Sequence, residues 1–183
     1  MEMQIIDPIK AGALRADFIK AFVDTSTEYY CELEKVKPTD TVCDHYVSRY
    51  LRDTLFWENT SAVPFRRAAE AVRGKARVYS MWDIRPGDVQ YPSFPGLAAM
   101  TYHHLEKYGS DTVIEWDAGE LADLLEGELG DYAGTDCTEN TLPEDVYIFD
   151  GSFEWCVIFT HSESANEAGE RLCYICRGRE SEA

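Results

Sequence analysis

Apolar residues recur at helical spacing through the first third of the chain. Asp7 followed by Pro8 is a typical helix start, with an N-cap residue and a proline in the first turn. The stripe that follows consists of Leu14, Phe18, Phe22 and Val23. Because these positions lie on one side of a helix, the pattern predicts a helix from Pro8 through Val23.

Further helical patterns occur at residues 29–36, at 39–57, at 64–72 and at 96–108. The first of these either continues the N-terminal helix or breaks from it near residues 25–27, and Pro38 ends it. Thr39 or Asp40 caps the second, which runs to about Trp57. Gly74 stops the third, since glycine readily adopts the left-handed conformation that follows a helix.

Another helix is predicted to begin at Asp117. Glu120 follows three residues later, as in a capping box. The apolar stripe of this helix consists of Leu121, Leu124, Leu125 and Leu129, and Gly130 closes it.

Runs rich in aromatic and β-branched residues predict strands at 78–82 and 112–116, and three more in the last third of the chain. The last three cover residues 146–149, 154–161 and 171–176. A tight turn at Asp150-Gly151-Ser152 joins the first two, and the third is expected antiparallel to the second. Residues 85–88 are expected to form a turn, and residues 131–144 an acidic loop.

Helices therefore come first and a meander comes last. This order predicts an α+β fold, in which a helix-rich N-terminal part packs on an antiparallel sheet with a C-terminal three-stranded meander. The 183 residues suffice for one buried core. We expect a single domain over residues 1–183, although the change of character near residue 75 could mark a subdomain boundary.

Acidic residues are concentrated in the second half of the chain. The net charge is −17; residues 1–100 contain 13 Lys and Arg against 14 Asp and Glu, whereas residues 101–183 contain 4 against 20. The negative electrostatic field of this half repels nucleic acid and anionic membranes and attracts basic surfaces. The plainer explanation is a solvated face that promotes solubility.

The start of the sequence, MEMQIIDPIKAG, lacks a basic region followed by an apolar run, so we expect no signal peptide. No apolar stretch approaches the roughly 18 residues that a membrane helix needs. We therefore expect a cytoplasmic protein with reduced thiols and no contact with membranes. The sequence contains no Gly-rich phosphate loop, no P-loop and no H-E-x-x-H motif, so we also expect no cofactor.

Cys173 and Cys176 form a C-x-x-C motif without the second pair of ligands that a zinc site needs. On a strand, residues three apart point to opposite faces, so we predict no metal site here. Cys156 and Cys173 are candidates to face each other across neighbouring strands, but the expected compartment argues against a disulfide.

The histidines offer no catalytic signature. Adjacent residues on a helix point about 100° apart, so His103 and His104 do not face a common site. We interpret them as one partly buried and one exposed side chain without a catalytic or metal-binding role. His161 could pair with Glu163 or Glu144 for acid–base chemistry. Asp150 is expected at the opposite end of the hairpin from His161. We therefore assign no catalytic residue.

One basic cluster lies between residues 66 and 85. Its members are Arg66, Arg67, Arg73, Lys75, Arg77 and Arg85. We interpret them as internal partners for the acidic half, because a nucleic-acid site would have to overcome the negative charge of the chain.

The segment 147–161 reads YIFDGSFEWCVIFTH: an aromatic strand, an Asp turn, Trp, then Thr-His. It resembles the C-terminal hairpin of small uncharacterised bacterial proteins, some of which look like immunity partners of secreted toxins. An acid commonly follows the His in those proteins; here Ser162 takes that place and Glu163 comes next. The resemblance covers about fifteen of 183 residues. It implies a bacterial source and a binding role, and carries over no catalytic residue.

The leading hypothesis is an acidic binding protein, most concretely an immunity or inhibitor protein that occludes a basic toxin such as a nuclease. Exposed Trp116 and Tyr132 would anchor the interface. The expected acidic contacts are Glu115, Asp117, Glu120, Asp123, Glu126, Glu128, Asp131 and Asp136. The alternatives are a small enzyme with a His–carboxylate site and a structural or adaptor domain, and the oligomeric state stays open.

Overall fold

The structure is a computed structural model, and it describes residues 3–24, 26, 52, 54–60, 64–83, 113–127, 145–160 and 172–177. The helices predicted over 29–36 and 96–108, most of the one over 39–57, the turn at 85–88 and the acidic loop at 131–144 lie outside these residues.

The described chain contains three helices and seven strands. Their order is β1 (Met3–Ile5), α1 (Pro8–Phe22), β2 (Trp57–Asn59), α3 (Pro64–Val72), β3 (Arg77–Asp83), β4 (Ile114–Asp117), α5 (Ala118–Glu126), β5 (Asp145–Phe149), β6 (Cys156–Thr160) and β7 (Leu172–Cys176). The strands form one sheet in the order β1-β4-β3-β5-β6-β7-β2, with every neighbouring pair antiparallel. The predicted α+β class and the antiparallel meander are confirmed.

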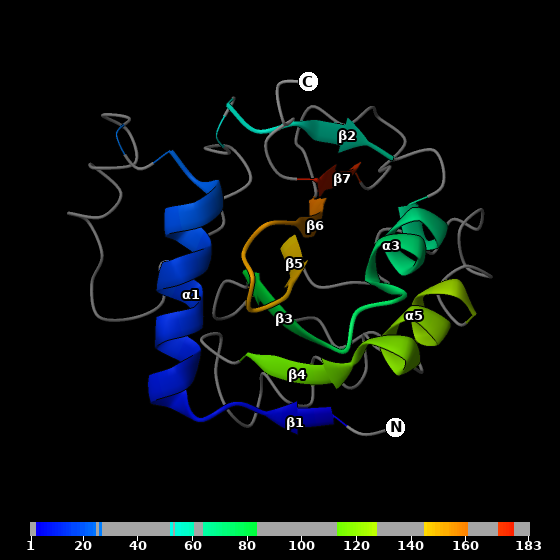
Figure 1. Cartoon of the computed structure of the whole chain (residues 1–183), viewed down its shortest axis with the longest axis horizontal. Helices are drawn as coiled ribbons and strands as arrows, with labels where there is room; N and C mark the ends of the chain where they lie inside the picture. The colour runs from blue at the N-terminus through cyan, green and yellow to red at the C-terminus, as the bar shows by residue number, and fades with distance from the viewer. Residues whose placement is uncertain are drawn as a thin grey trace.

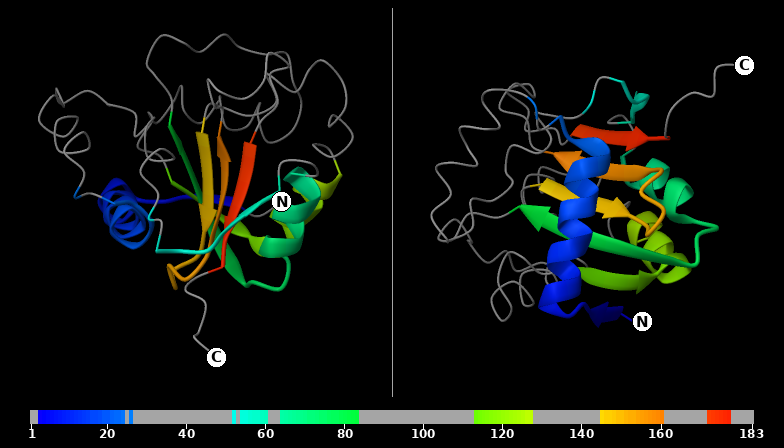
Figure 2. Two further views of the ribbon diagram at one scale, coloured as in Figure 1. Left: turned by 90° about the horizontal axis from the view of Figure 1, so that it is seen from above. Right: turned by 60° about the vertical axis from the view of Figure 1, so that its left-hand side comes forward.

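The helices cover both faces of the sheet. Helix α1 lies across one face, and α3 and α5 lie side by side on the other (Figure 1; Figure 2, left). Two cores result, one between α1 and the sheet and one between the sheet and the α3–α5 layer. Successive side chains of β5 and β6 point into opposite cores. Val146, for example, packs in the core beneath α3 and α5, and Tyr147 packs in the core beneath α1. The residues 146–149 of β5 and 156–159 of β6 are therefore all apolar.

Helix α1 begins as predicted. The Asp7 carboxylate accepts the backbone N–H groups of Ile9 at 3.0 Å and Lys10 at 3.3 Å, which have no partner within the helix. Further along, the ring of Phe18 lies 5.3 Å from that of Tyr147 between centroids, edge to face. The apolar stripe read from the sequence thus packs on the sheet.

Helices α3 and α5 also follow their sequence signals. Gly74 follows α3 with φ of +92°, a conformation that side chains rarely adopt. Asp117 caps α5 by accepting the backbone N–H of Glu120 at 3.1 Å. The helix ends at Glu126, before the predicted stop at Gly130.

Three local predictions are corrected. Trp57 lies in strand β2, opposite Cys176, and not at the end of a helix. The connection after β5 spans residues 150–155 rather than the predicted three-residue turn at 150–152, and Phe153 in it has φ of +54°. β1 was missed altogether. Strands of three residues are too short to show an alternating pattern, so β1 and β2 exist only through their pairing with β4 and β7.

Candidate functional site

The predicted acidic site is divided between the two faces of the sheet. Glu115 on β4 lies directly opposite Tyr79 on β3 and Gln4 on β1. Directly opposed residues of antiparallel strands share one face, and Tyr79 packs in the core beneath α1. Glu115 therefore lies on the α1 side, away from the acids of α5, and cannot share a flat interface with them.

Trp116 is not an exposed anchor, and that expectation is wrong. Its side chain is 0% exposed, in the core beneath α5 with Leu121 and Leu125. Its indole N–H donates to Oγ of buried Ser80 at 2.8 Å. The cause is strand alternation: when Glu115 faces α1, Trp116 must face the α3–α5 layer.

Asp117 caps the N-terminus of α5. It is half-buried, and its carboxylate is occupied by the backbone N–H of Glu120 at the start of α5. An N-cap contributes about 1 kcal/mol to stability. Of the predicted contacts that the structure describes, Glu120, Asp123 and Glu126 remain as one acidic row, because residues three apart on a helix are neighbours.

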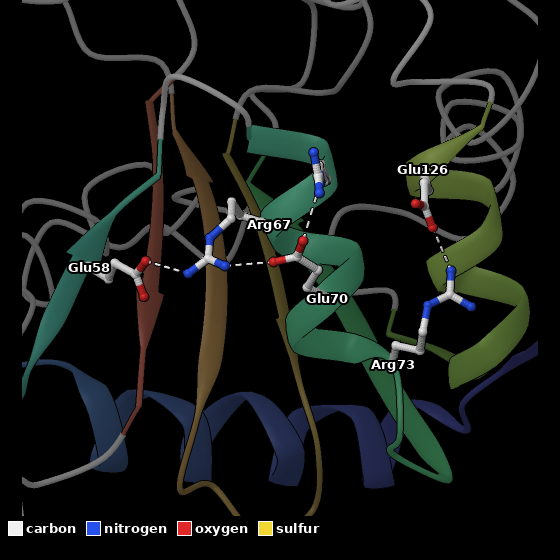
Figure 3. A network of polar contacts seen from close by, with 6 residues as sticks. Glu58, Arg67, Glu70, Arg73 and Glu126 are labelled. Carbon is white, nitrogen blue, oxygen red and sulfur yellow. Dashed lines mark hydrogen bonds and ion pairs between the residues drawn. The ribbon is translucent and has the colours of Figure 1, made fainter.

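Arg73 pairs with two acids of this row. Its Nη1 lies 3.0 Å from Oδ1 of Asp123. Its Nη2 lies 2.7 Å from Oε2 of Glu126, and Figure 3 shows this second contact. The side chains of Asp123 and Glu126 remain 73% and 57% exposed. Hydrogen bonds to these carboxylates raise the pKa of Arg73. For Arg73, the interpretation of the basic cluster as internal partners of the acidic half is confirmed.

A second ion-pair network joins α3 to β2. Arg67 contacts Oε1 of Glu58 at 2.5 Å and Oε2 of Glu70 at 2.6 Å (Figure 3). Arg177, after β7, contacts Glu58 at 2.8 Å, and Arg66 contacts Glu70 at 3.3 Å. The hydrogen bond from Arg67 lowers the pKa of Glu58 and of Glu70.

Both networks and the acidic row make up what we term the α3–α5 charged surface. It consists of Glu58, Arg66, Arg67, Glu70, Arg73, Glu120, Asp123, Glu126 and Arg177. Basic and acidic groups are almost balanced on it. Most of the acids of residues 101–183 lie outside the described residues, among them Glu128, Asp131 and Asp136. The surplus negative charge of the chain is therefore not found on this surface.

Two depressions of about 420 and 410 Å³ share Arg177 as a wall residue. The second lies beside α3, where Lys75 and Trp155 also line it. The Nζ atom of Lys75 lies 4.7 Å from the centroid of the Trp155 ring, within the range of a cation–π contact. The residues that line the depression beside α3 are far apart in the sequence, so no local sequence pattern could predict it.

Asp150 organises the loop between β5 and β6. Its carboxylate accepts the backbone N–H of Ser152 at 2.9 Å and the indole N–H of Trp155 at 2.6 Å, and it lies 3.8 Å from Nζ of Lys75. Burial acts to raise the pKa of Asp150, but the hydrogen bonds from Ser152 and Trp155 outweigh it and the pKa is lowered. The contacts of Asp150 are thus structural.

The cysteines are arranged differently from one of the expectations. Cys156 lies opposite Cys176, and Cys173 lies opposite Phe159, so the suggested facing of Cys156 and Cys173 is wrong. The divergence of Cys173 and Cys176 is confirmed, since the first packs beneath α3 and α5 and the second beneath α1. Within the described residues, no group of three His, Cys, Asp or Glu could hold a metal ion.

The other candidates lie outside the part of the chain that the structure describes. They are His103, His104, His161, Tyr132, Arg85, Glu144 and Glu163. Among the described helices, none has the length and apolar character that crossing a membrane requires.

No protein-family model, no curated protein and no solved structure matches this chain. Function is therefore inferred from charge, burial and contacts.

Proposed function

We propose that this chain is an acidic binding protein, most concretely a bacterial immunity or inhibitor protein that neutralises a basic toxin, such as a nuclease, in the cytoplasm. The observation that supports the proposal is the segregation of charge: 20 acids against 4 bases after residue 100. Proteins that cut nucleic acids carry basic surfaces for phosphate. An acidic partner would speed encounter with such a surface and cover it.

Helix α5 offers a firm support for part of this interface. Leu121 and Leu125 are 0% exposed and hold the helix on the sheet. Asp123 and Glu126 point away from that core and stay largely in solvent. Carboxylates on a packed helix lose little freedom on binding, which favours affinity.

The proposed contact set differs from the one read from the sequence. It keeps Glu120, Asp123, Glu126, Glu128, Asp131, Tyr132 and Asp136. It omits Glu115, Trp116 and Asp117, because these lie on the other face, in the core and in a helix cap.

The test starts with capture of partners by the tagged chain, which is co-expressed with neighbouring gene products. Capture is done at low salt and at about 0.5 M salt, because at the higher concentration charge interactions act over only a few ångströms. A second bait carries Asp123→Asn and Glu126→Gln, which remove two charges from α5 without changing side-chain size. A third carries Asp17→Asn and Glu154→Gln, which remove the same charge from exposed positions elsewhere.

We expect a basic protein to bind the wild-type chain stoichiometrically and to be released by salt. Its toxic activity should be inhibited by the bound chain. The α5 bait should retain less of it than the control bait, which has the same net charge. If no partner binds at either salt concentration, the proposed function is wrong. If both variant baits bind equally, the function stands and the α5 contact is wrong.

A further inference from the structure

Two thiols face each other inside the sheet. Cys156, the first residue of β6, and Cys176, the last residue of β7, are partners in the antiparallel register. Both are 0% exposed and belong to the core beneath α1, and neither is part of a disulfide. After burial, the interaction with the side chain of Cys176 is the next largest cause of the raised pKa of Cys156.

The Cα separation at this register position is compatible with a covalent bond between them, although the Cβ atoms have to move closer together for the bond to form. Thr60, which directly follows β2, donates its backbone N–H to the carbonyl oxygen of Cys173 at 2.8 Å. The backbone N–H and C=O groups of Cys173 therefore point toward β2. Backbone groups of successive residues point to opposite edges of a strand, so those of Cys176, three residues on, point toward β6. Cys156 and Cys176 are thus a hydrogen-bonded pair. Such pairs have Cα atoms about 5.5 Å apart, within the disulfide range of about 4.4–6.8 Å.

We propose that Cys156 and Cys176 form a site of reversible oxidative modification, at which hydrogen peroxide converts the two thiols to a disulfide. One thiolate attacks a peroxide oxygen and breaks the O–O bond. A sulfenic acid forms, and the departing hydroxide takes up a proton to become water. The second sulfur then attacks the sulfenic sulfur. The S–O bond breaks, and the hydroxyl leaves with the remaining thiol proton as a second water. Two thiols and one peroxide thus give one disulfide and two waters.

An oxidant would approach the pair at the end of the sheet, on the α1 side. Arg177, which follows Cys176, has a side chain that is 55% exposed. It lines a depression together with Phe22 and Phe153, which pack in the same core as the two thiols. Because burial raises the pKa of Cys156 well above its usual value, little thiolate is present at neutral pH. Oxidation should therefore be slow at neutral pH and faster as the pH rises.

Cys173 is the matched control. It lies on the same strand and is also 0% exposed, but it faces the opposite core and is opposed by Phe159. It therefore has the same kind of burial as Cys176 without a thiol across from it.

The experiment uses the full chain and hydrogen peroxide. Oxidised protein is alkylated in denaturant and digested with trypsin, which yields peptides 108–171 and 172–177. A cross-link between them is assigned to individual cysteines by fragmentation, so the wild-type chain alone is informative. The variants Cys156→Ala, Cys176→Ala and Cys173→Ala are treated in parallel.

We expect the intact mass to fall by two hydrogen atoms and to recover with dithiothreitol. The link should join Cys156 to Cys176, persist in Cys173→Ala and disappear in the other two variants. A link through Cys173 or Cys137 would overturn the proposal. So would over-oxidation of Cys156 or Cys176 without a link, or no reaction of either thiol. The result does not depend on the proposed partner.

Discussion

The guanidinium of Arg73 lies 3.0 Å from the carboxylate of Asp123, tying the end of α3 to the outer side of α5. The same guanidinium reaches Glu126 at 2.7 Å. Arg73 thus occupies the place where a basic side chain of the proposed partner would bind. A basic side chain of that partner would have to compete with Arg73 for these carboxylates.

Replacement of Arg73 should therefore favour the partner. We expect Arg73→Gln to speed association at low salt several-fold, because two exposed carboxylates lose their internal cation. The urea midpoint should hardly change, since exposed ion pairs contribute little to stability. Arg66→Gln is the control, because Arg66 pairs with Glu70 and not with α5. Stopped-flow rates that change equally in both variants would argue against competition at α5.

The effects of replacing Trp116 and Ser80 on stability should be coupled, because the two side chains share a buried hydrogen bond. Trp116→Phe leaves a cavity and an unpaired hydroxyl, and should lower the free energy of unfolding by about 2–4 kcal/mol. Ser80→Ala leaves a buried indole N–H unpaired, at a cost of about 1–3 kcal/mol. The double variant should cost about 1 kcal/mol less than the sum. Additive losses in urea denaturation would mean that the bond contributes nothing.

Asp150 should make stability depend on pH in the acid range. Its pKa in the folded chain is below the ordinary value of 3.8, so its contribution is present above that value and is lost as the pH falls through the folded-state pKa. Asp150→Asn should cost about 1 kcal/mol at neutral pH, the scale of a partly screened hydrogen bond to a charged group. The difference from wild type should shrink near pH 3. A difference that is constant with pH would show that the charge is irrelevant.

Two glycines should respond to alanine in opposite directions. A Cβ atom at either Gly12 or Gly74 would meet nothing within 4 Å, so only the backbone matters. Gly12 lies within α1, where alanine should stabilise by about 0.5–1 kcal/mol. Gly74 has φ of +92°, so alanine there should destabilise by about 1 kcal/mol or more. Thermal unfolding that shifts the same way in both variants would contradict this.

Local signals in the sequence predicted much of the scaffold. The caps at Asp7 and Asp117 mark the starts of α1 and α5, and Gly74 marks the end of α3. These predictions succeed because a cap satisfies backbone groups within three residues of itself. The meander of β5, β6 and β7 was predicted for a similar reason, since its strands are consecutive in the chain and long enough to show their composition.

The candidate site could not be predicted in the same way. Alternation along β4 implies that Glu115 and Trp116 face opposite sides, but not which side is covered by α1 and which by α5. Because helices cover both faces of this sheet, neither face is uniformly polar, and no sequence pattern distinguishes them. The same holds for the thiols, where the register of β6 against β7 made Cys176 the neighbour of Cys156.

By itself, then, the sequence determined the acidic second half, the helix caps and the class of fold, because each depends on composition or on residues a few positions apart. Only the tertiary structure decided that Trp116 is buried, that Arg73 lies against Asp123, and that the short edge strands β1 and β2 exist. Each of these depends on contacts between segments distant in the chain, which packing of both faces of the sheet creates.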